Sequence, residues 1–364
     1  MEDISPESLE DNEVFFITMG EIILDELHFS NGDKMVEVLG GAGTYAALGA
    51  RLHLPPPVSQ SLYLMIEAGY DLPSSVEDSL RSWDTRLDVR KDPTKKTTRA
   101  KVVYEDATFG PKTFEYLAST MTLLPSRLRP LALSSASFHL ICPPETLKEQ
   151  IPGILALRQR HGMYQRPLFI WEPEGSFCSR DSLEAHLEAA RLVDIFSPNR
   201  FEVSALFGSS GNPLDESSLE TMCALFVDRG IGPLSKGTIV VRSDEHGCFA
   251  MSSALPFTSF PAHSSVVLPT RGGNAGHGGS KVVDPTGAGH AFLGGFTIGL
   301  IKTGSVIDAV GYGSVSATFA LEQIGLPKFK RGSATEEETW NRDTVARRLR
   351  QYGSLGRSAE SEQN

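Results

Sequence analysis

The sequence has few cysteines, no basic block and no long apolar run. Cys142, Cys178, Cys223 and Cys248 are too far apart for a CxxC metal motif, so we expect reduced thiols in or near the core. A formal net charge of -11 without a cluster of lysine or arginine disfavours a nucleic acid or an anionic membrane as the main partner. No apolar stretch is long enough to cross a bilayer. These absences leave a globular protein that acts on or binds something small.

The N-terminus also lacks the features of a targeting segment. Residues 1–12 are acidic and polar, where a signal or transit peptide would be apolar or basic. We therefore expect a flexible, solvated arm and a cytoplasmic location. The 364 residues suffice for one large core with a small accessory element, or for two modest domains.

Several short apolar runs have the length of buried strands. They cover residues 14–20, 61–66, 138–142, 167–173 and 193–197, and helical stretches alternate with the last three. This alternation predicts an α/β fold with a doubly wound, mostly parallel sheet that binds ligands at the carboxyl ends of its strands. His139 lies inside one apolar run, which favours a core histidine over a ligand. Residues 97–104 and 113–116 read as a β-hairpin with a Gly-Pro turn.

One segment carries most of the chemical information. Residues 282–296 contain the end of an apolar strand, the sequence DPTGAGH and then a helical pattern. Gly287, Ala288 and Gly289 have almost no side chain, so their N–H groups can approach an anion at a helix N-terminus. A lone GxG would more often be a simple turn before a buried helix.

A second glycine pair opens another predicted helix. In residues 37–52, Gly40 and Gly41 let the backbone approach a ligand, and the alanines that follow let the helix pack closely on a sheet. Asp25 follows the first predicted strand. Its type and position fit a turn residue.

Two further segments have distinctive local sequences. Asn199 and Glu202 have the spacing of a helix N-cap and its capping-box partner. Residues 270–280 are glycine-rich, but no apolar helix follows at once, so they indicate a flexible surface insertion. No GxGxxG follows the first strand, which excludes a dinucleotide-binding oxidoreductase.

Together, DPTGAGH, the Gly40-Gly41 pair and the N-x-x-E of residues 199–202 resemble the ribokinase (PfkB) family of sugar and nucleoside kinases. Within it, residues 195–199, 283–289 and 319–327 are most similar to a fungal branch, the maintenance-of-killer proteins. The resemblance implies a ribokinase-like fold at 13–330, with helices on both sheet faces. It also implies a small β lid from about 21–39 and 97–117. The insertion then spans about 268–281, and a C-terminal helix and polar tail occupy 331–364.

The resemblance further implies ATP and Mg²⁺ as cofactors and a small-molecule alcohol, a sugar or nucleoside, as substrate. The implied site residues fall into three groups. The implied catalytic residues are His290 and the anion hole, which consists of Gly287, Ala288 and Gly289. The implied substrate-binding residues are Asp25, Gly40 and Gly41. The implied nucleotide-binding residues are Asn199, Glu202, Ser243, Gly247, Thr286 and Gly287, and Glu202 also lies near the metal. Arg99, within the lid segment, reads as a solvated arginine or a contact for a substrate anion. Oligomerisation through the lid stays open.

Residue 290 departs from the family pattern. Family members place the base, an aspartate, at the end of D-x-x-G-A-G-D, and this chain has His290 there. The asparagine expected shortly after the glycine pair is also absent, so the substrate is not specified. Two readings follow: an ATP-dependent kinase of a small alcohol, or a nucleotide- or ligand-binding pseudokinase with a regulatory or interaction role.

Overall fold

The computed structural model describes residues 13–106, 112–209, 215–263, 282–333 and 335–362. The arm at residues 1–12, the Gly-Pro turn and the predicted insertion at 268–281 lie outside the described residues. The chain divides into two compact units. Among the described residues, 20–123 and 263 onward form the first unit, and 13–19 with 124–262 form the second.

The second unit is built on a mostly parallel sheet. Its strands follow the order β13-β12-β11-β10-β9-β8-β1. The pairs from β1 to β11 are parallel, and β12 and β13 are added antiparallel. The bounds are β1 (Phe16–Thr18), β8 (Ser137–Cys142), β9 (Leu168–Pro173), β10 (Ile195–Phe196), β11 (Thr238–Arg242), β12 (Cys248–Ser252) and β13 (Thr258–Phe260).

Apolar residues explain why this sheet is buried on both faces. Phe16, Phe138, Phe169 and Phe196 are fully buried on successive strands, as expected for parallel strands covered on both sides. The connecting helices are α3 (Pro130–Leu133), α4 (Pro144–Arg160), α5 (Leu183–Ala190), α6 (Arg200–Leu206) and α7 (Glu216–Arg229). The alternation of strand and helix predicted from the sequence is therefore confirmed.

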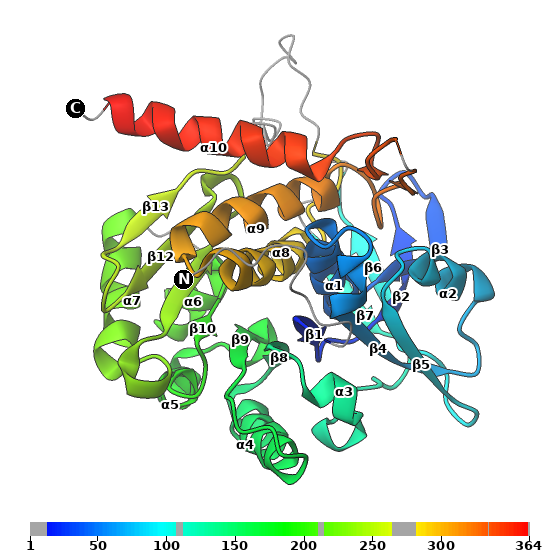
Figure 1. Ribbon diagram of the computed structural model, residues 1–364, viewed down its shortest axis with the longest axis horizontal. Coiled ribbons are helices and arrows are strands. Elements are labelled where there is room, and N and C mark those ends of the chain that lie inside the picture. The colour runs from blue at the N-terminus through cyan, green and yellow to red at the C-terminus, as the bar shows by residue number, and fades with distance from the viewer. Residues whose placement is uncertain (1–12, 107–111, 210–214, 264–281, 334, 363–364) are drawn as a thin grey trace. The chain divides into compact units, whose positions relative to one another are not determined.

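The first unit combines a helical layer with smaller sheets. Its helices are α1 (Ala42–Leu52), α2 (Ser74–Arg81), α8 (Ala288–Thr303), α9 (Val306–Leu321) and α10 (Val345–Glu362). Helix α8 packs between α1 and α9, and α10 lies against α9 (Figure 1). Helix α8 starts after Gly287 and stops before Gly304, both left-handed (φ 82° and 66°), which favours glycine at each end.

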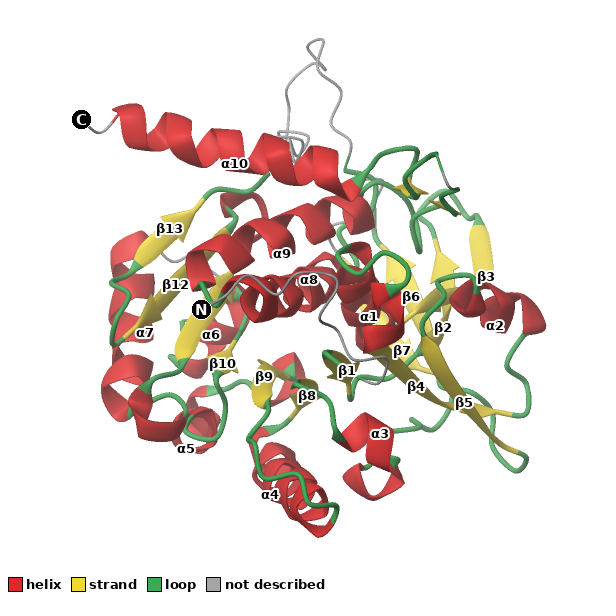
Figure 2. Ribbon diagram, in the orientation of Figure 1, coloured by secondary structure: helices red, strands yellow, loops and turns green. Residues whose placement is uncertain are grey.

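The strands of the first unit form three groups. β4 (Leu62–Gly69) pairs in parallel with β5 (Arg86–Asp92), and β14 (Phe329–Lys330) pairs with β15 (Thr339–Trp340). A four-stranded sheet has the order β3-β2-β6-β7 (Figure 2). We call it the lid sheet; it holds β2 (Ile23–His28), β3 (Lys34–Gly40), β6 (Arg99–Tyr104) and β7 (Lys112–Tyr116). The expected lid strands and hairpin are thus present.

Three expectations need correction. The small residues of α1 pack mainly on helix α8, although α1 also contacts strands β3 and β4: a β-carbon on Gly49 would overlap the carbonyl oxygen of Ala291. The predicted polar tail is helical as far as Glu362. Strand β5 was not predicted because its residues, RLDVRKD, are mostly charged and only partly buried.

Single residues from the sequence analysis are also located. All four cysteines are buried and free of disulfides. His139 is fully buried, with ring nitrogens 3.1 Å from the Thr18 hydroxyl and 3.4 Å from the Glu172 carboxylate, which confirms a core histidine. Arg99 is partly exposed, and its guanidinium lies 3.0 Å from the Asp71 carboxylate, so it forms an ion pair within the first unit.

Candidate functional site

The predicted anion loop is the N-terminal turn of α8. Gly287 is the N-cap, and Ala288, Gly289 and His290 form the first turn, where N–H groups have no acceptor within the helix itself. The Ala288 N–H donates to the Pro285 carbonyl over 3.3 Å. The helix dipole adds partial positive charge at this end. The segment therefore has the local geometry for holding a phosphoryl group.

A tyrosine ring covers one side of this loop. A β-carbon on Gly287 would overlap the aromatic ring of Tyr45, which projects from α1 and is 3 % exposed. The Tyr45 ring therefore fills the space on that side of Gly287. Gly287 is thus required by its left-handed backbone and by close packing.

The loop is tied to the lid sheet by hydrogen bonds. The hydroxyl of Tyr104 on β6 donates to Asp284 Oδ2 over 2.9 Å, and the Thr286 backbone N–H donates to Asp284 Oδ1 over 2.9 Å. Lys112 on β7 places its Nζ 2.6 Å from the Thr286 hydroxyl oxygen. An ammonium group therefore stands one residue before the anion loop.

Asp25 lies in the middle of β2, which rules out the turn reading. Its side chain abuts Gly40 on β3 so closely that a β-carbon on Gly40 would overlap Asp25 Oδ2. The residue is 7 % exposed, and Oδ1 has no hydrogen-bond partner among the described residues. Burial, followed by the charge of Asp284, raises the pKa of Asp25 from 3.8 to about 7, although Lys112 acts to lower it.

Backbone conformation and close packing explain the two glycines that precede α1. Gly41 is the N-cap of α1 with φ 91°, and a β-carbon there would lie 2.5 Å from the carbonyl oxygen of Glu21. Gly40 is the neighbour of Asp25, and its carbonyl accepts a 2.7 Å hydrogen bond from the Thr44 hydroxyl. The pair allows two chain segments to meet beside the buried carboxylate.

His290 occupies the third position of α8 and is partly exposed. The predicted residues Asp25, Gly40, Gly41 and Thr286–His290 all belong to the first unit. Asn199, Glu202, Ser243 and Gly247 belong to the second unit.

In the second unit, Asn199 and Glu202 form the capping box that their spacing predicted. Glu202 N–H donates to Asn199 Oδ1 over 2.9 Å, and Asn199 N–H donates to Glu202 Oε2 over 2.7 Å. Arg242 lies 3.7 Å from the same carboxylate. Glu202 is thus held at the start of α6 with one oxygen already engaged.

Ser243 and Gly247 shape the turn between β11 and β12. The Ser243 N–H donates to the Gly247 carbonyl over 2.8 Å, and Gly247 has φ 79°. The Ser243 hydroxyl is buried and has no hydrogen-bond partner among the described residues. Of the two, only Ser243 has a side-chain group available to a ligand.

Comparison with known proteins decides the family. The profile described as "pfkB family carbohydrate kinase" matches residues 10–328. The chain belongs to the PfkB family of carbohydrate kinases. The resemblance stated from DPTGAGH and the glycine pair is therefore confirmed.

The PfkB relatives include two fungal proteins of similar length. An uncharacterized protein of Schizosaccharomyces pombe is 31 % identical over 346 residues, 93 % of each chain. Protein MAK32 of Saccharomyces cerevisiae is 28 % identical over 356 residues, 92 % of this chain and 91 % of its own. A shorter match, 48 % over 50 residues, links 14 % of each chain with the inositol 3-kinase of Arabidopsis thaliana.

Solved structures of PfkB relatives share the fold. A putative ribokinase II from Escherichia coli, in complex with ATP and Mg²⁺, superposes with a TM-score of 0.61 at 17 % identity over 86 % of this chain and 94 % of its own. Arabidopsis thaliana ribokinase, complexed with ribose and ATP, gives 0.62 at 17 % identity with the same coverage. The ribokinase-like fold predicted from the sequence is thus established.

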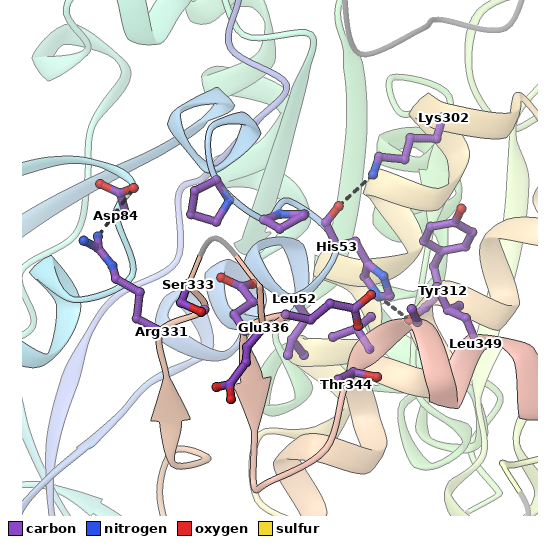
Figure 3. A pocket seen from close by; sticks show the side chains of 17 residues that line it. Leu52, His53, Asp84, Lys302, Tyr312, Arg331, Ser333, Glu336, Thr344 and Leu349 are labelled. Atoms are coloured by element: carbon purple, nitrogen blue, oxygen red, sulfur yellow. Dashed lines mark hydrogen bonds and ion pairs between the residues drawn. The ribbon is translucent and has the colours of Figure 1, made fainter.

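A pocket in the first unit lies apart from these residues. It has a volume of about 590 Å³, and Leu52, His53, Lys302 and Arg331 are among the residues that line it (Figure 3). Lys302 donates to the His53 carbonyl over 2.7 Å. Burial lowers the pKa of His53 to about 3, so its imidazole is neutral near pH 7. None of the predicted site residues lines this pocket.

Three residues of the first-unit site were missed in the sequence. Lys112, Tyr104 and Tyr45 come from β7, β6 and α1 and meet the anion loop only after folding. Among the described residues, every helix is too short or too polar to cross a membrane, and no three His, Cys, Asp or Glu side chains are grouped as a metal site.

Proposed function

We propose that this PfkB protein binds ATP with Mg²⁺ and transfers the γ-phosphoryl group to a hydroxyl of a small carbohydrate-like alcohol. Backbone N–H groups of Gly287, Ala288 and Gly289 hold the phosphoryl oxygens, and Lys112 adds positive charge beside them. Phosphoryl transfer depends mainly on positioning and charge stabilisation, which this arrangement supplies. The alcohol binds next to Asp25, Gly40 and Gly41.

One observation carries the proposal. Asp25 is a buried carboxylate with a free oxygen, and its charge interacts with Asp284, which is bonded to the residue just before the phosphate-binding turn. A buried polar atom without a partner is costly and needs an explanation, and a catalytic or ligand-binding role supplies one. A hydroxyl group is a fitting ligand because it can donate a hydrogen bond to Oδ1.

The oxygen ligands that the chain offers suit Mg²⁺ bound together with the nucleotide better than a metal ion held by protein side chains alone. Mg²⁺ commonly takes one or two carboxylates and completes its shell with phosphate oxygens and water, so a group of three acidic ligands is not required. When bound, Mg²⁺ supplies charge neutralisation between the phosphates. We assign Glu202, Asn199 and Ser243 to the nucleotide side on the family pattern, with Glu202 as the metal-proximal carboxylate.

The test is consumption of ATP against a panel of alcohols that includes ribose and myo-inositol. The proposal predicts ADP formation that depends on one acceptor and on Mg²⁺. Lys112→Met should lower turnover, while Lys236→Met, a lysine of the second unit outside the predicted site, serves as the control. ATP binding without any acceptor-dependent turnover would reject the transfer step.

His290 supports a second candidate, a nucleotide-binding pseudokinase with a regulatory or interaction role. Loss of a carboxylate base commonly lowers the rate by about 10² to 10⁴-fold. In an enzyme that is already slow, such a decrease would leave no detectable turnover. This reading predicts ATP binding with no phosphorylated product for any acceptor in the panel. The same assay therefore separates the two candidates.

A further inference from the structure

Asp25 is an acidic side chain in a position that a strand would normally fill with an apolar residue. Its neighbours along β2, Leu24 and Leu27, are buried and apolar. Oδ2 packs against Gly40, and Oδ1 lacks a hydrogen-bond partner among the described residues. An asparagine or leucine would satisfy packing without the cost of a buried carboxylate. Packing alone therefore does not explain this residue.

We propose that Asp25 is the general base of the phosphoryl transfer and supplies the carboxylate that position 290 lacks. The inference rests on the proposed function and names the group that receives the proton. It moves the base from the N-terminus of α8 to the lid sheet. Asp25 then both binds the acceptor hydroxyl and deprotonates it.

Asp284 is the other carboxylate of the first-unit site, but its hydrogen bonds exclude it as the general base. Its Oδ2 accepts a hydrogen bond from the Tyr104 hydroxyl, and its Oδ1 accepts one from the Thr286 backbone. Both oxygens are committed to holding the loop before α8. Asp25 Oδ1 has no hydrogen-bond partner among the described residues, so it is the better proton acceptor.

The surroundings of Asp25 also suit a base that works near neutral pH. Asp284 from the loop before α8 repels its negative form, Lys112 from β7 attracts it, and Tyr45 and Tyr104 interact with it from α1 and β6. With burial as the largest cause, the pKa of Asp25 rises to about 7. A base is most effective when its pKa is close to the working pH.

The step balances as follows. The acceptor hydroxyl oxygen forms a bond to the γ-phosphorus of ATP while its proton passes to Asp25 Oδ1. The bond between the γ-phosphorus and the bridging oxygen breaks, and ADP leaves with that electron pair. The products are a phosphate monoester, ADP and protonated Asp25, which then releases its proton to water.

A cross between two substitutions tests this assignment. We compare the unmodified protein with Asp25→Asn, His290→Asp and the double variant, using ATP with Mg²⁺ and ribose or myo-inositol as acceptor. Asp25→Asn keeps the shape of the side chain but removes its basicity. It should lower kcat by about 10² to 10⁴-fold with the affinity for ATP unchanged. Circular dichroism and the unfolding midpoint confirm that each variant is folded.

Rescue separates a base from a residue that only binds substrate. A carboxylate at position 290 should restore kcat of Asp25→Asn to within about tenfold of the unmodified protein. In the unmodified protein kcat should rise with pH through about 7, the pKa of Asp25, and the double variant should lose this dependence. A substrate-binding role alone would raise KM and would not be rescued at position 290.

Each other outcome rejects a defined claim. If Asp25→Asn keeps its kcat, or only His290→Asp is active, Asp25 is not the base and the inference is wrong. If no variant phosphorylates an acceptor although ATP binds, the proposed transfer itself is wrong. If ATP does not bind to the folded protein, the phosphate-binding assignment fails before either claim is reached.

Discussion

At the scale of single residues, the account depends on two positions. His290 stands where the family resemblance predicts an aspartate, and Asp25 is buried on β2 with an Oδ1 that has no hydrogen-bond partner among the described residues. The sequence could identify both positions through the family resemblance. It could not show that Asp25 interacts electrostatically with Asp284, Lys112, Tyr45 and Tyr104, because those residues come from four segments that are distant in the sequence.

We predict that His290→Asp increases kcat on any acceptor that is phosphorylated. A carboxylate carries the negative charge that holds a hydroxyl proton, whereas the imidazole ring is bulkier and places its basic nitrogen at a different reach. The comparison uses kcat at saturating ATP. A variant slower by roughly tenfold or more, with unchanged ATP affinity, would mean that His290 itself works as the base.

We also predict that Asp25 makes stability depend on pH. Folding raises its pKa from 3.8 to about 7, so the folded state binds the proton more tightly than the unfolded chain. The contribution is fully present below about pH 4 and is lost as the pH rises to about 7. The upper bound of that loss is about 4 kcal/mol.

Asp25→Asn should therefore unfold at a higher urea concentration than the unmodified protein at pH 8 and should lose less stability between pH 5 and 8. Asp228→Asn, at an exposed position of α7, is the matched control. Equal pH dependence in Asp25→Asn and the unmodified protein would show that Asp25 is not destabilised by burial.

At the scale of elements, the crossing of α1 and α8 positions the site. Gly49 and Gly294 bring the two backbones together: a β-carbon on Gly294 would overlap the carbonyl oxygen of Ala46. This close approach sets Tyr45 over Gly287. The sequence indicated close packing through its small residues but missed α8 as the main partner, because alanine and glycine indicate close approach without identifying the other element.

We predict that Gly49→Ala destabilises the protein, because the new methyl group meets backbone that cannot rotate away. The expected loss is about 1 to 3 kcal/mol, as for other overpacked cores. Gly353→Ala in α10 is the control: no atom lies within 4 Å of the added carbon, and helix propensity predicts a gain of roughly 0.5 to 1 kcal/mol. Equal unfolding midpoints for both variants would contradict the packing account.

At the scale of the whole molecule, apolar runs and glycine motifs predicted the family, the parallel strands and the lid sheet. They did so because buried strands and phosphate-binding turns restrict residue type strongly. Charged β5 and the helical end of α10 escaped prediction, since their residues are also compatible with loops. Lys112 was missed because β7 is exposed at every residue and has no motif.

The central claim is that the N-terminal turn of α8 holds the phosphates of ATP. Isothermal titration of the folded protein with ATP and Mg²⁺ tests it most directly, because it needs no acceptor and no turnover. We predict saturable binding that is retained in His290→Asp, since the phosphates are held largely by backbone N–H groups. Absence of binding at millimolar ATP, with the protein folded throughout, would contradict the account.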